Sequence, residues 1–390
     1  MTVSTGPPPS PHAEIVIDLA AIRGNLRRLR ELASEGSSPA PAMMAVVKAD
    51  AYGHGMVPVA RASREAGAEW LGVATREEAL AVRAAGDTGR LLCWLVAPGA
   101  DFEPLVTADV DVTASSSAQV EDVVRGAREA GRAARLQLKF DTGLSRNGAS
   151  RGDWLELVTA ARIAQDEGTA VVTGLWSHLA CADEPDHPAN AAQQEAFDEA
   201  CALATDAGLE PEVRHLANSA GGLFHPRTRH DLVRFGISLY GFSPAPDVVA
   251  TADLGLVPAM TVRATTVLAK DLQPGDGVSY GHTFVATEAM RVALVPIGYA
   301  DGLPRHASSK AEVQTGGARA PVLGRICMDQ LVVSAPGAHA GDEVVLLGTG
   351  AQGEPTATDW ARWAGTIEYE IVSRMGGRPT RLWVDSEERR

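Results

Sequence analysis

The sequence predicts an α/β protein in which an N-terminal (β/α)8 barrel is followed by a C-terminal, mainly β domain. Three observations lead to this prediction. The chain has 390 residues, more than one hydrophobic core usually supports. Eight apolar runs alternate with helical patterns between Met43 and Phe235. Beyond Pro244 the pattern changes to short β-like runs separated by Gly and Pro turns.

The N-terminal segment, residues 1–13, is rich in proline and is expected to be a disordered tail. It has neither the basic region nor the apolar region of a signal peptide. Glu14–Asp18 alternates apolar and polar residues, which predicts a strand. Asp18 can then cap a helix that runs to about Leu32.

The eight apolar runs are the predicted barrel strands. They are Met43–Lys48, Trp70–Ala74, Leu91–Ala97, Val110–Thr113, Leu136–Phe140, Val171–Ser177, Val213–Leu216 and Leu232–Phe235. Three of the helical patterns between them end in glycine, a common signal for a helix C-terminus. Strands that alternate with helices form parallel βα units, and eight units predict a closed barrel over residues 14–245. The spacing of the strands along the chain does not show whether the sheet closes, so a doubly wound open sheet is the alternative.

Residues 246–385 are predicted to form the second domain. Its strand-like runs are Thr261–Ala269, Arg291–Ile297, Leu331–Ser334 and Val344–Leu347, and Thr358–Trp363 is its one helical pattern.

Composition excludes several classes of function. The formal net charge is -14, from 49 acidic and 35 basic residues, and no basic stripe offsets it, which argues against nucleic-acid binding. No apolar run approaches the roughly 20 residues of a membrane helix. The four cysteines form no Cys-x-x-Cys pair and are too few for a disulfide framework, so a reducing, cytoplasmic setting is expected.

Polar or small residues follow five of the eight predicted strands. They are Lys48 after the first, Lys139, Asp141 and Arg146 at or after the fifth, His178 after the sixth, Asn218 and Ser219 after the seventh, and Arg234, Gly236 and Ile237 at the eighth. In a barrel the strand C-termini and the loops that follow them carry the chemistry. These residues are therefore expected to meet at one mouth of the barrel.

The loops after the seventh and eighth strands have the residue types of a phosphate site. Barrels often bind phosphate there through backbone N–H groups and hydroxyls, which Ser219, Gly236 and Ile237 could supply. A phosphate site combined with Lys48 suggests pyridoxal phosphate, held by a Schiff base at one end and by its phosphate at the other. A sugar-phosphate substrate with Lys48 as a simple contact is the alternative.

Nine motifs make the chain resemble the alanine racemases, which are pyridoxal-phosphate enzymes with a barrel and a β domain. The motifs are A-V-V-K-A-D-A-Y-G-H-G, K-F-D-T-G-L-S-R-N-G, S-H-L-A, A-N-S-A, R-F-G-I-S-L-Y-G, V-S-Y-G-H-T-F, P-I-G-Y-A-D-G, G-R-I-C-M-D-Q and T-I-E-Y-E. They occur in the family's order, and the resemblance runs from about Glu14 to Val384. Leu144, where many members have methionine, and Gly221–Gly222 depart from the family pattern.

The resemblance implies a set of cofactor-binding residues: Lys48, Tyr52, His178, Asn218, Ser219, Arg234, Gly236, Ile237 and Tyr369. Lys48 would carry the cofactor as an aldimine. Arg234 would face the pyridine nitrogen, which stays an acceptor because a guanidinium does not give up its proton. No metal is implied.

The resemblance also implies two catalytic bases, Lys48 and Tyr280, with Tyr280 supplied by the other subunit of a homodimer. Racemisation removes a proton from one face of a carbon and returns one to the other face, so two opposed bases suffice. Nearby cations, Arg146 and Arg234, are hypothesised to lower the pKa of these bases. Arg146 and the Met328 backbone would bind the substrate carboxylate.

Three further positions carry weaker expectations. Tyr299 and Arg305 would lie along the path by which substrate reaches the site. In relatives the lysine before D-T-G can be carbamylated, so Lys139 is a candidate for this modification; a salt bridge to Asp141, or a solvated lysine, is the alternative.

Together these features predict a bacterial alanine racemase that supplies D-alanine for the peptidoglycan of the cell wall. Two alternatives stay open: a related racemase for serine or a broader set of amino acids, and a non-catalytic protein that binds pyridoxal phosphate. The second is disfavoured by the β domain with its S-Y-G-H-T-F motif, because barrel-only carriers lack a second base.

Overall fold

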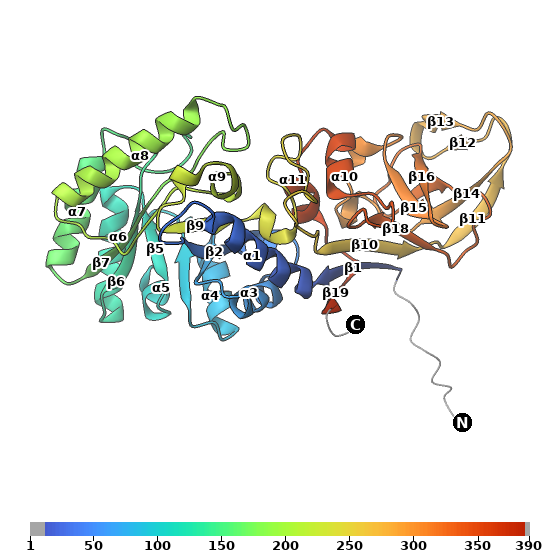
Figure 1. Ribbon diagram of the computed structural model, residues 1–390. Helices are drawn as coiled ribbons and strands as arrows, with labels where there is room; N and C mark the ends of the chain where they lie inside the picture. Colours follow the sequence, from blue (N-terminus) through green and yellow to red (C-terminus); the bar gives the residue numbers. More distant parts are fainter. Residues whose placement is uncertain (1–11, 387–390) are drawn as a thin grey trace, which may run out of the picture. The chain divides into compact units, whose positions relative to one another are not determined.

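The computed structural model describes residues 12–386 (Figure 1), so nearly all of the predicted tail lies outside the described residues. The chain divides into two compact units, and each is described by itself. The barrel unit comprises Ile22–Ala51 and Gly55–Leu256. The β unit comprises residues 12–21, Tyr52–His54 and residues 257–386. The exact domain limits expected from the sequence, residues 14–245 and 246–385, stay predictions.

Eight parallel strands form the sheet of the barrel unit, in the order β8-β7-β6-β5-β4-β3-β2-β9. They are β2 (Ala42–Val46), β3 (Trp70–Val73), β4 (Arg90–Cys93), β5 (Asp111–Ala114), β6 (Ala134–Lys139), β7 (Ala170–Trp176), β8 (Val213–His215) and β9 (Leu232–Phe235). Each overlaps one of the predicted runs.

Backbone hydrogen bonds join the two ends of this strand order. The N–H of Asp231 donates to the carbonyl of Arg214 at 3.0 Å, and the N–H of Arg234 donates to the carbonyl of Ala217 at 3.1 Å. These bonds connect β9 to β8 and the residues that follow it. The predicted barrel is therefore confirmed, and the open-sheet alternative is not supported.

Helices lie around these strands (Figure 1). They are α1 (Leu19–Ser34), α3 (Met56–Glu65), α4 (Arg76–Ala84), α5 (Glu103–Thr107), α6 (Ser117–Ala130), α7 (Trp154–Asp166), α8 (Ala189–Asp206) and α9 (Ser219–Phe224), with 3-10 turns η1 (Pro226–Thr228) and η2 (Ile237–Tyr240). The three glycine-terminated patterns correspond to α4, α6 and α8. Gly86, Gly131 and Gly208 follow them, each with positive φ, as a helix C-terminus requires.

The strands are buried because helices cover their outer face and side chains fill the interior. Every residue of β3, β5 and β9 is buried. Each large apolar side chain so buried contributes about 1.5–3 kcal/mol. The result is a rigid ring whose loops can hold side chains in fixed positions.

The β unit is built on a nine-stranded sheet, in the order β11-β14-β17-β16-β15-β18-β10-β1-β19, and a two-stranded one, β12-β13. The strands are β1 (Ala13–Asp18), β10 (Met260–Thr265), β11 (Leu268–Leu272), β12 (Gly277–Val278), β13 (Phe284–Val285), β14 (Met290–Val295), β15 (Glu312–Thr315), β16 (Ala318–Leu323), β17 (Leu331–Ser334), β18 (Glu343–Leu347) and β19 (Thr380–Val384). The helical segments are α10 (Ala357–Ala364), α11 (Glu368–Arg374), η3 (Tyr280–His282), η4 (Tyr299–Asp301) and η5 (Arg305–Ala307).

Two strands of this unit differ from the sequence-based expectation. β1 occupies almost the predicted residues, but it pairs with β10 and β19 and so belongs to the β unit. The predicted run Thr261–Ala269 is two strands, β10 and β11. They separate at Thr266, whose hydroxyl donates to the carbonyl of His339 at 2.7 Å.

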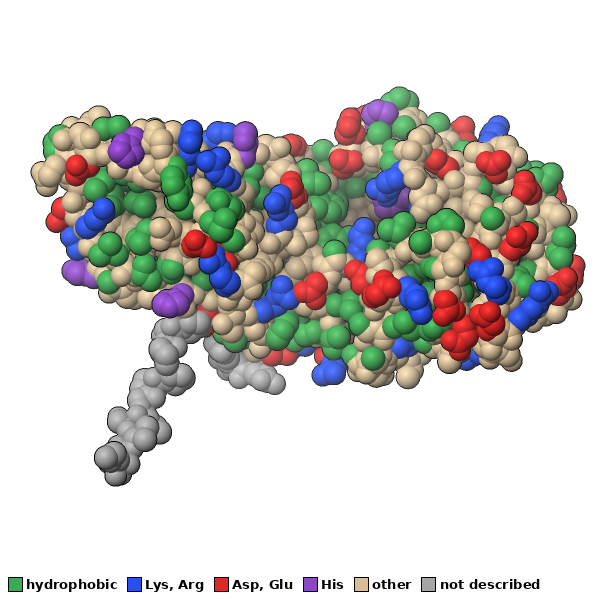
Figure 2. Space-filling model, turned by 180° about the vertical axis from the view of Figure 1, so that it is seen from behind, with side chains coloured by type: hydrophobic (Ala, Val, Ile, Leu, Met, Phe, Trp, Pro, Cys, Tyr) green, Lys and Arg blue, Asp and Glu red, His purple; other side chains and the backbone are tan. Residues whose placement is uncertain are grey.

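The surface carries both signs of charge. On the face shown in Figure 2, lysine and arginine side chains are intermixed with acidic ones, and no continuous basic stripe is visible among the described residues. None of the helices within residues 12–386 has both the length and the apolar character needed to span a membrane.

Candidate active site

The predicted site residues of the barrel unit follow the C-terminal ends of its parallel strands, so they lie at one end of the ring. Direct bonds connect several of them. Nη2 of Arg234 lies 3.2 Å from Nδ1 of His178, and the N–H of Gly236 donates to Oγ of Ser219 at 3.0 Å. The charge of Arg146 acts on both Lys48 and Lys139, and that of Arg234 acts on Lys139. The predicted gathering at one mouth is thus observed for this group.

A left-handed turn follows the first barrel strand. The strand was predicted to run to Lys48, but it ends at Val46, and the four residues from Ala49 to Tyr52 have φ between 52° and 53°. Non-glycine residues pay about 1–2 kcal/mol each for this conformation. The turn is held by Oε1 of Glu78, which accepts from the N–H of Ala49 at 2.6 Å. Strain maintained beside a lysine is typical of a functional site.

Lys48 begins this turn and is half-buried. Its Nζ lies 5.9 Å from the centroid of the Trp94 ring, a residue that the sequence analysis did not single out. Burial, and secondarily the positive charge of Arg146, lower the pKa of Lys48, while Glu78 opposes them. The hypothesis that Arg146 tunes this lysine agrees with the structure, whereas Arg234 is not among the groups that shift it.

Arg234 is buried at the centre of the mouth, with 4% of its surface exposed. Its two terminal amino groups donate to three carbonyl oxygens, those of Ser177 (2.8 Å), His215 (3.1 Å) and Leu216 (3.0 Å). Its Nε–H donates to none of the described residues. Burial lowers the pKa of Arg234 to about 9. One N–H of a firmly held guanidinium is therefore left to face a ligand.

The bonds of Arg234 also determine the protonation of two histidines. Its amino groups lie 3.0 Å from Nδ1 of His215 and 3.2 Å from Nδ1 of His178. Since a guanidinium only donates, both Nδ1 atoms must accept, and the ring proton lies on Nε2. In His215 that proton faces Oε1 of Gln137 at 2.8 Å. Burial and the charge of Arg234 hold the pKa of both rings well below the ordinary value.

Lys139 is buried at the end of β6, with its Nζ 4.1 Å from the Trp176 ring centroid. Among the described residues, it forms no hydrogen bond or ion pair through its amine. The alternative of a salt bridge to Asp141 is not observed, because Oδ1 of Asp141 accepts from the N–H groups of Gly143 and Ser145 instead. Burial, and then the charges of Arg234 and Arg146, lower the pKa of Lys139 to about 7. The Lys139 amine therefore has a large neutral fraction near neutral pH.

The loops expected to bind phosphate lie side by side, as the Ser219–Gly236 bond shows. Asn218 caps α9 by accepting the N–H of Gly221 at 2.9 Å, so its side chain has a structural role. Ile237 is the first residue of η2, so its N–H has no acceptor within that turn. A hydroxyl and free N–H groups at the starts of two helical turns suit an anion.

The predicted residues of the β unit make two separate sets of contacts. Tyr52 and Tyr369 have ring centroids 6.2 Å apart. The N–H of Tyr299 donates to the carbonyl of Cys327, and that of Ala300 to the carbonyl of Met328, both at 3.0 Å. Arg305 is exposed in η5.

Tyr280 is 69% exposed, and its hydroxyl forms no hydrogen bond with any described residue. Such exposure is what the prediction of a site shared between subunits requires of this side chain.

Four residues that were not predicted contact the predicted ones: Glu78, Trp94, Trp176 and His215. Gln137 in turn bonds to His215. Trp176 directly precedes the S-H-L-A motif, and His215 lies just before A-N-S-A. Their position beside these motifs could have indicated that they lie near the site. Their rings stack at 5.6 Å with an interplanar angle of 6°.

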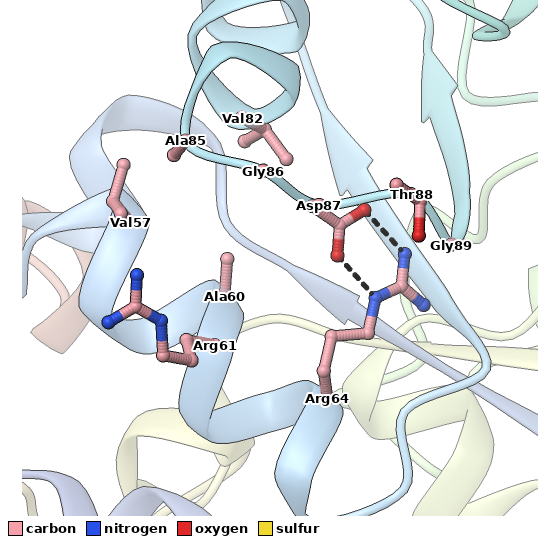
Figure 3. Close-up of a pocket in the computed structure, with 10 residues that line it drawn as sticks. All are labelled: Val57, Ala60, Arg61, Arg64, Val82, Ala85, Gly86, Asp87, Thr88 and Gly89. Carbon is pink, nitrogen blue, oxygen red and sulfur yellow. Dashed lines mark hydrogen bonds and ion pairs between the residues drawn. The ribbon is translucent and has the colours of Figure 1, made fainter.

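A separate cavity of about 350 Å³ lies between α3, α4 and the segment before β4 (Figure 3). In it Arg64 donates to both oxygens of Asp87, at 2.8 and 3.1 Å. Gly86–Gly89 precede β4, so this cavity is at the N-terminal end of that strand and is not part of the mouth. Within the described residues, no group of three or more His, Cys, Asp and Glu side chains could hold a metal ion.

Comparisons with known proteins cover both units. The family model for the alanine racemase N-terminal domain matches residues 17–244, and that for the C-terminal domain matches residues 259–383. The alanine racemase of Streptomyces coelicolor is 53% identical over 380 residues, 96% of each chain, and that of Frankia casuarinae is 50% identical over 95% of each.

Solved structures agree with these matches. The alanine racemase of the D-cycloserine producer Streptomyces lavendulae is 52% identical, with a TM-score of 0.94, covering 97% of this chain and 98% of that one. The enzyme of Corynebacterium glutamicum is 36% identical, with a TM-score of 0.83, covering 96% of this chain and 100% of that one.

Proposed function

The chain belongs to the alanine racemase family, and from that premise we propose that it interconverts L-alanine and D-alanine by two-base proton transfer with pyridoxal 5'-phosphate. The enzyme class is that of an isomerase. The proposal depends on one observation at the barrel mouth. There Lys48 has a lowered pKa, and the Nε–H of Arg234 donates to none of the described residues.

The residues present suit pyridoxal phosphate by their donor chemistry. Lys48 would hold it covalently, and the Nε–H of Arg234 would donate to its ring nitrogen. Ser219 and the N–H of Ile237 would bind its phosphate, and the backbone of Gly236 would be part of the same site, with its N–H holding the Ser219 hydroxyl. Tyr52 and Tyr369 would complete the phosphate site, while Asn218 shapes it by capping α9 and His178 supports the ring.

When bound, this cofactor withdraws electrons from the substrate Cα and so makes its proton removable. Nζ of Lys48 would move the proton on one face, because burial and Arg146 favour its neutral form. Oη of Tyr280 of the partner subunit would move it on the other. Arg146 and the Met328 backbone would hold the carboxylate, and Tyr299 and Arg305 would lie along the path to the site.

The setting of the reaction is also part of the proposal. A homodimer in the cytoplasm would supply D-alanine for peptidoglycan. The related alternatives, a serine or broad-specificity racemase and an inert cofactor-binding protein, predict different substrate turnover. Assaying racemisation of alanine and serine side by side separates them, since a carrier would turn over neither.

Subunit complementation tests the shared site. Lys48→Ala and Tyr280→Phe homodimers are each expected to lose racemisation. When the two variants are unfolded, mixed and refolded, each heterodimer regains one site with an intact Lys48 and an intact Tyr280. We expect recovered activity in the mixture and none when either variant is refolded alone. Failure to recover activity in heterodimers that demonstrably form would refute the shared site.

A further inference from the structure

Ser279, the residue before Tyr280, has an unusual backbone conformation. Its φ is 60° and its ψ is -170°. This region is adopted almost only by glycine, because a Cβ atom is crowded there. A non-glycine residue persists in such a conformation only where its surroundings hold it, and such positions concentrate at functional sites.

The Ser279 side chain supplies that hold. Its hydroxyl donates to the carbonyl of Arg325 at 2.6 Å and lies 3.2 Å from Sγ of Cys327. The segment that provides these partners lies flush against the loop. A Cβ at Gly324 would come within 2.6 Å of the carbonyl oxygen of Val278, so only glycine allows this approach.

The core anchors both segments. Val278, just before Ser279, and Leu323, just before Gly324, are buried in the same apolar cluster, each with 5% of its surface exposed. Across the loop, Val278 pairs with Phe284 in the β12–β13 ladder. The imidazole of His282 covers Gly277 so closely that a Cβ there would lie 2.3 Å from the ring. The loop from Ser279 to Thr283 is thus fixed at both ends.

Tyr280 itself has no such support. Its ring is 69% exposed, and its hydroxyl has no hydrogen-bond partner among the described residues. Among the described residues no hydrogen bond fixes this side chain, so its direction follows from that of its backbone. The direction of the Tyr280 backbone depends in turn on the backbone conformation of Ser279, the residue before it.

We propose that Ser279 is a positioning residue for the second base: its hydroxyl, bonded to the Arg325 carbonyl and contacting the Cys327 thiol, keeps its own backbone in the strained conformation that aims Tyr280. The inference rests on the proposed function, because it assigns Ser279 a role only through Tyr280. A misplacement of about 1 Å can cost on the order of 100-fold in rate, so the hold has a measurable consequence.

The first test is Ser279→Ala, which removes the hydroxyl and keeps the Cβ. We expect kcat/KM to fall roughly 10- to 100-fold with no matching loss of thermal stability. Ser279→Gly should lose at least as much activity while its Tm is unchanged or higher, because glycine adopts this conformation without strain. Thr315→Val is the matched control. Its hydroxyl also donates to a backbone carbonyl, that of Glu343 at 3.3 Å, but far from the loop in sequence, and activity should be unchanged.

Isotope effects add a readout that a purely structural role would not move. The two enantiomers have the same free energy, so kcat/KM must fall equally in both directions. Cα-deuterated substrates give the kinetic isotope effect on kcat/KM for each enantiomer. If only the step that uses Tyr280 is slowed, this isotope effect should rise for one enantiomer and fall for the other. Equal changes for both enantiomers would overturn the proposal.

A double-mutant cycle with Tyr280→Phe distinguishes failure of the positioning role of Ser279 from failure of the proposed role of Tyr280. If Ser279 acts through Tyr280, adding Ser279→Ala to Tyr280→Phe should cost nothing further. If the two losses multiply, the positioning role is wrong although Tyr280 remains the base. If Tyr280→Phe exchanges the Cα proton of both enantiomers as fast as the unaltered protein, the proposed role of Tyr280 fails, and the inference with it.

Discussion

Oε1 of Glu78 accepts a hydrogen bond from the backbone N–H of Ala49 at 2.6 Å. The other oxygen of this carboxylate accepts from the N–H groups of Ala74 (2.8 Å) and Thr75 (3.1 Å) at the start of α4. Thr75 returns the contact by accepting the N–H of Glu78, which completes a capping box. One side chain therefore fixes both a helix terminus and the left-handed turn that begins at Lys48.

Replacing Glu78 should show the effect of its charge on Lys48. Gln keeps one acceptor oxygen, which can hold the N–H of Ala49 or those of the α4 start but not both, and it removes the negative charge that raises the pKa of Lys48. In Glu78→Gln that pKa should fall further, and the acidic limb of the pH profile of kcat/KM should move to lower pH. Glu78→Ala should in addition lose about 1–2 kcal/mol of stability with the cap. Equal stability losses and unshifted pH profiles in both variants would contradict this account.

Arg234 should be important for folding as well as for cofactor binding. Arg234 reaches five acceptors from two nitrogens: three carbonyl oxygens and Nδ1 of both His178 and His215. Lysine has only three N–H donors, all on one nitrogen, so Arg234→Lys would leave buried acceptors unsatisfied. We expect a loss of about 2–4 kcal/mol in the free energy of unfolding, measured with urea. Arg214→Lys is the matched control. Its partner Asp231 lies 3.5 Å away at the surface, so the change should be within about 0.5 kcal/mol. Similar losses in both variants would show that the carbonyl network is not critical.

The neutral histidines make stability depend on pH. The pKa values of His178 and His215 are well below the ordinary value in the folded protein, so the unfolded chain binds more protons as the pH falls below about 6.5. Stability from these groups is therefore fully present above that pH and is lost as the pH falls towards the folded pKa. Each histidine contributes up to about 1.4 kcal/mol per pH unit.

Urea unfolding between about pH 7.5 and about pH 5 measures this slope. His215→Gln should make the slope shallower, whereas His339→Gln, at an exposed position, should not. A slope unaffected by His215→Gln would mean that His215 is already charged when buried, against the hydrogen-bond pattern with Arg234.

The barrel and its mouth could be predicted because they depend on local signals. A parallel strand buried on both faces is an apolar run, and a polar residue at its end is then a candidate for function, as Lys139 is at the end of β6. The candidate residues can be located without knowing the order of the strands in the sheet. Candidate site residues next to strand ends can accordingly be predicted from their position alone.

Contacts distant in sequence could not be predicted in this way. The turn at Ala49 has no glycine to indicate positive φ, and its support comes from Glu78, 29 residues later. The conformation of Ser279 likewise depends on Arg325, 46 residues away. His215 is an ordinary histidine in sequence, and only its bond to Arg234 determines its tautomer. Strain and protonation state are set by the folded surroundings.

Lys139 is expected to be carbamylated. An amine adds to carbon dioxide only when neutral, and a pKa of about 7 leaves a large neutral fraction near neutral pH. The nitrogen of the neutral amine forms a bond to the carbon of CO2 and releases one proton, which leaves an anion. Counted from the ammonium form, two protons are lost and a cation becomes an anion. Arg146 and Arg234, which now repel the ammonium, would stabilise that anion. Since Arg146 is exposed and makes no hydrogen bond within residues 12–386, the carbamate would give it a partner beside the substrate carboxylate.

Carbon-13 NMR with labelled bicarbonate tests this directly, because the chain has only four lysines. One carbamate signal is expected, absent in Lys139→Arg and retained in Lys310→Arg, whose side chain is exposed. Lys139→Arg should also raise the KM for alanine, since a cation in place of the carbamate would push Arg146 away from its position. The signal should weaken as the pH falls below about 7, because protonation of the amine removes the nucleophile. A spectrum without a carbamate signal above that pH would show that Lys139 acts as a plain amine and that Arg146 is oriented by the substrate alone.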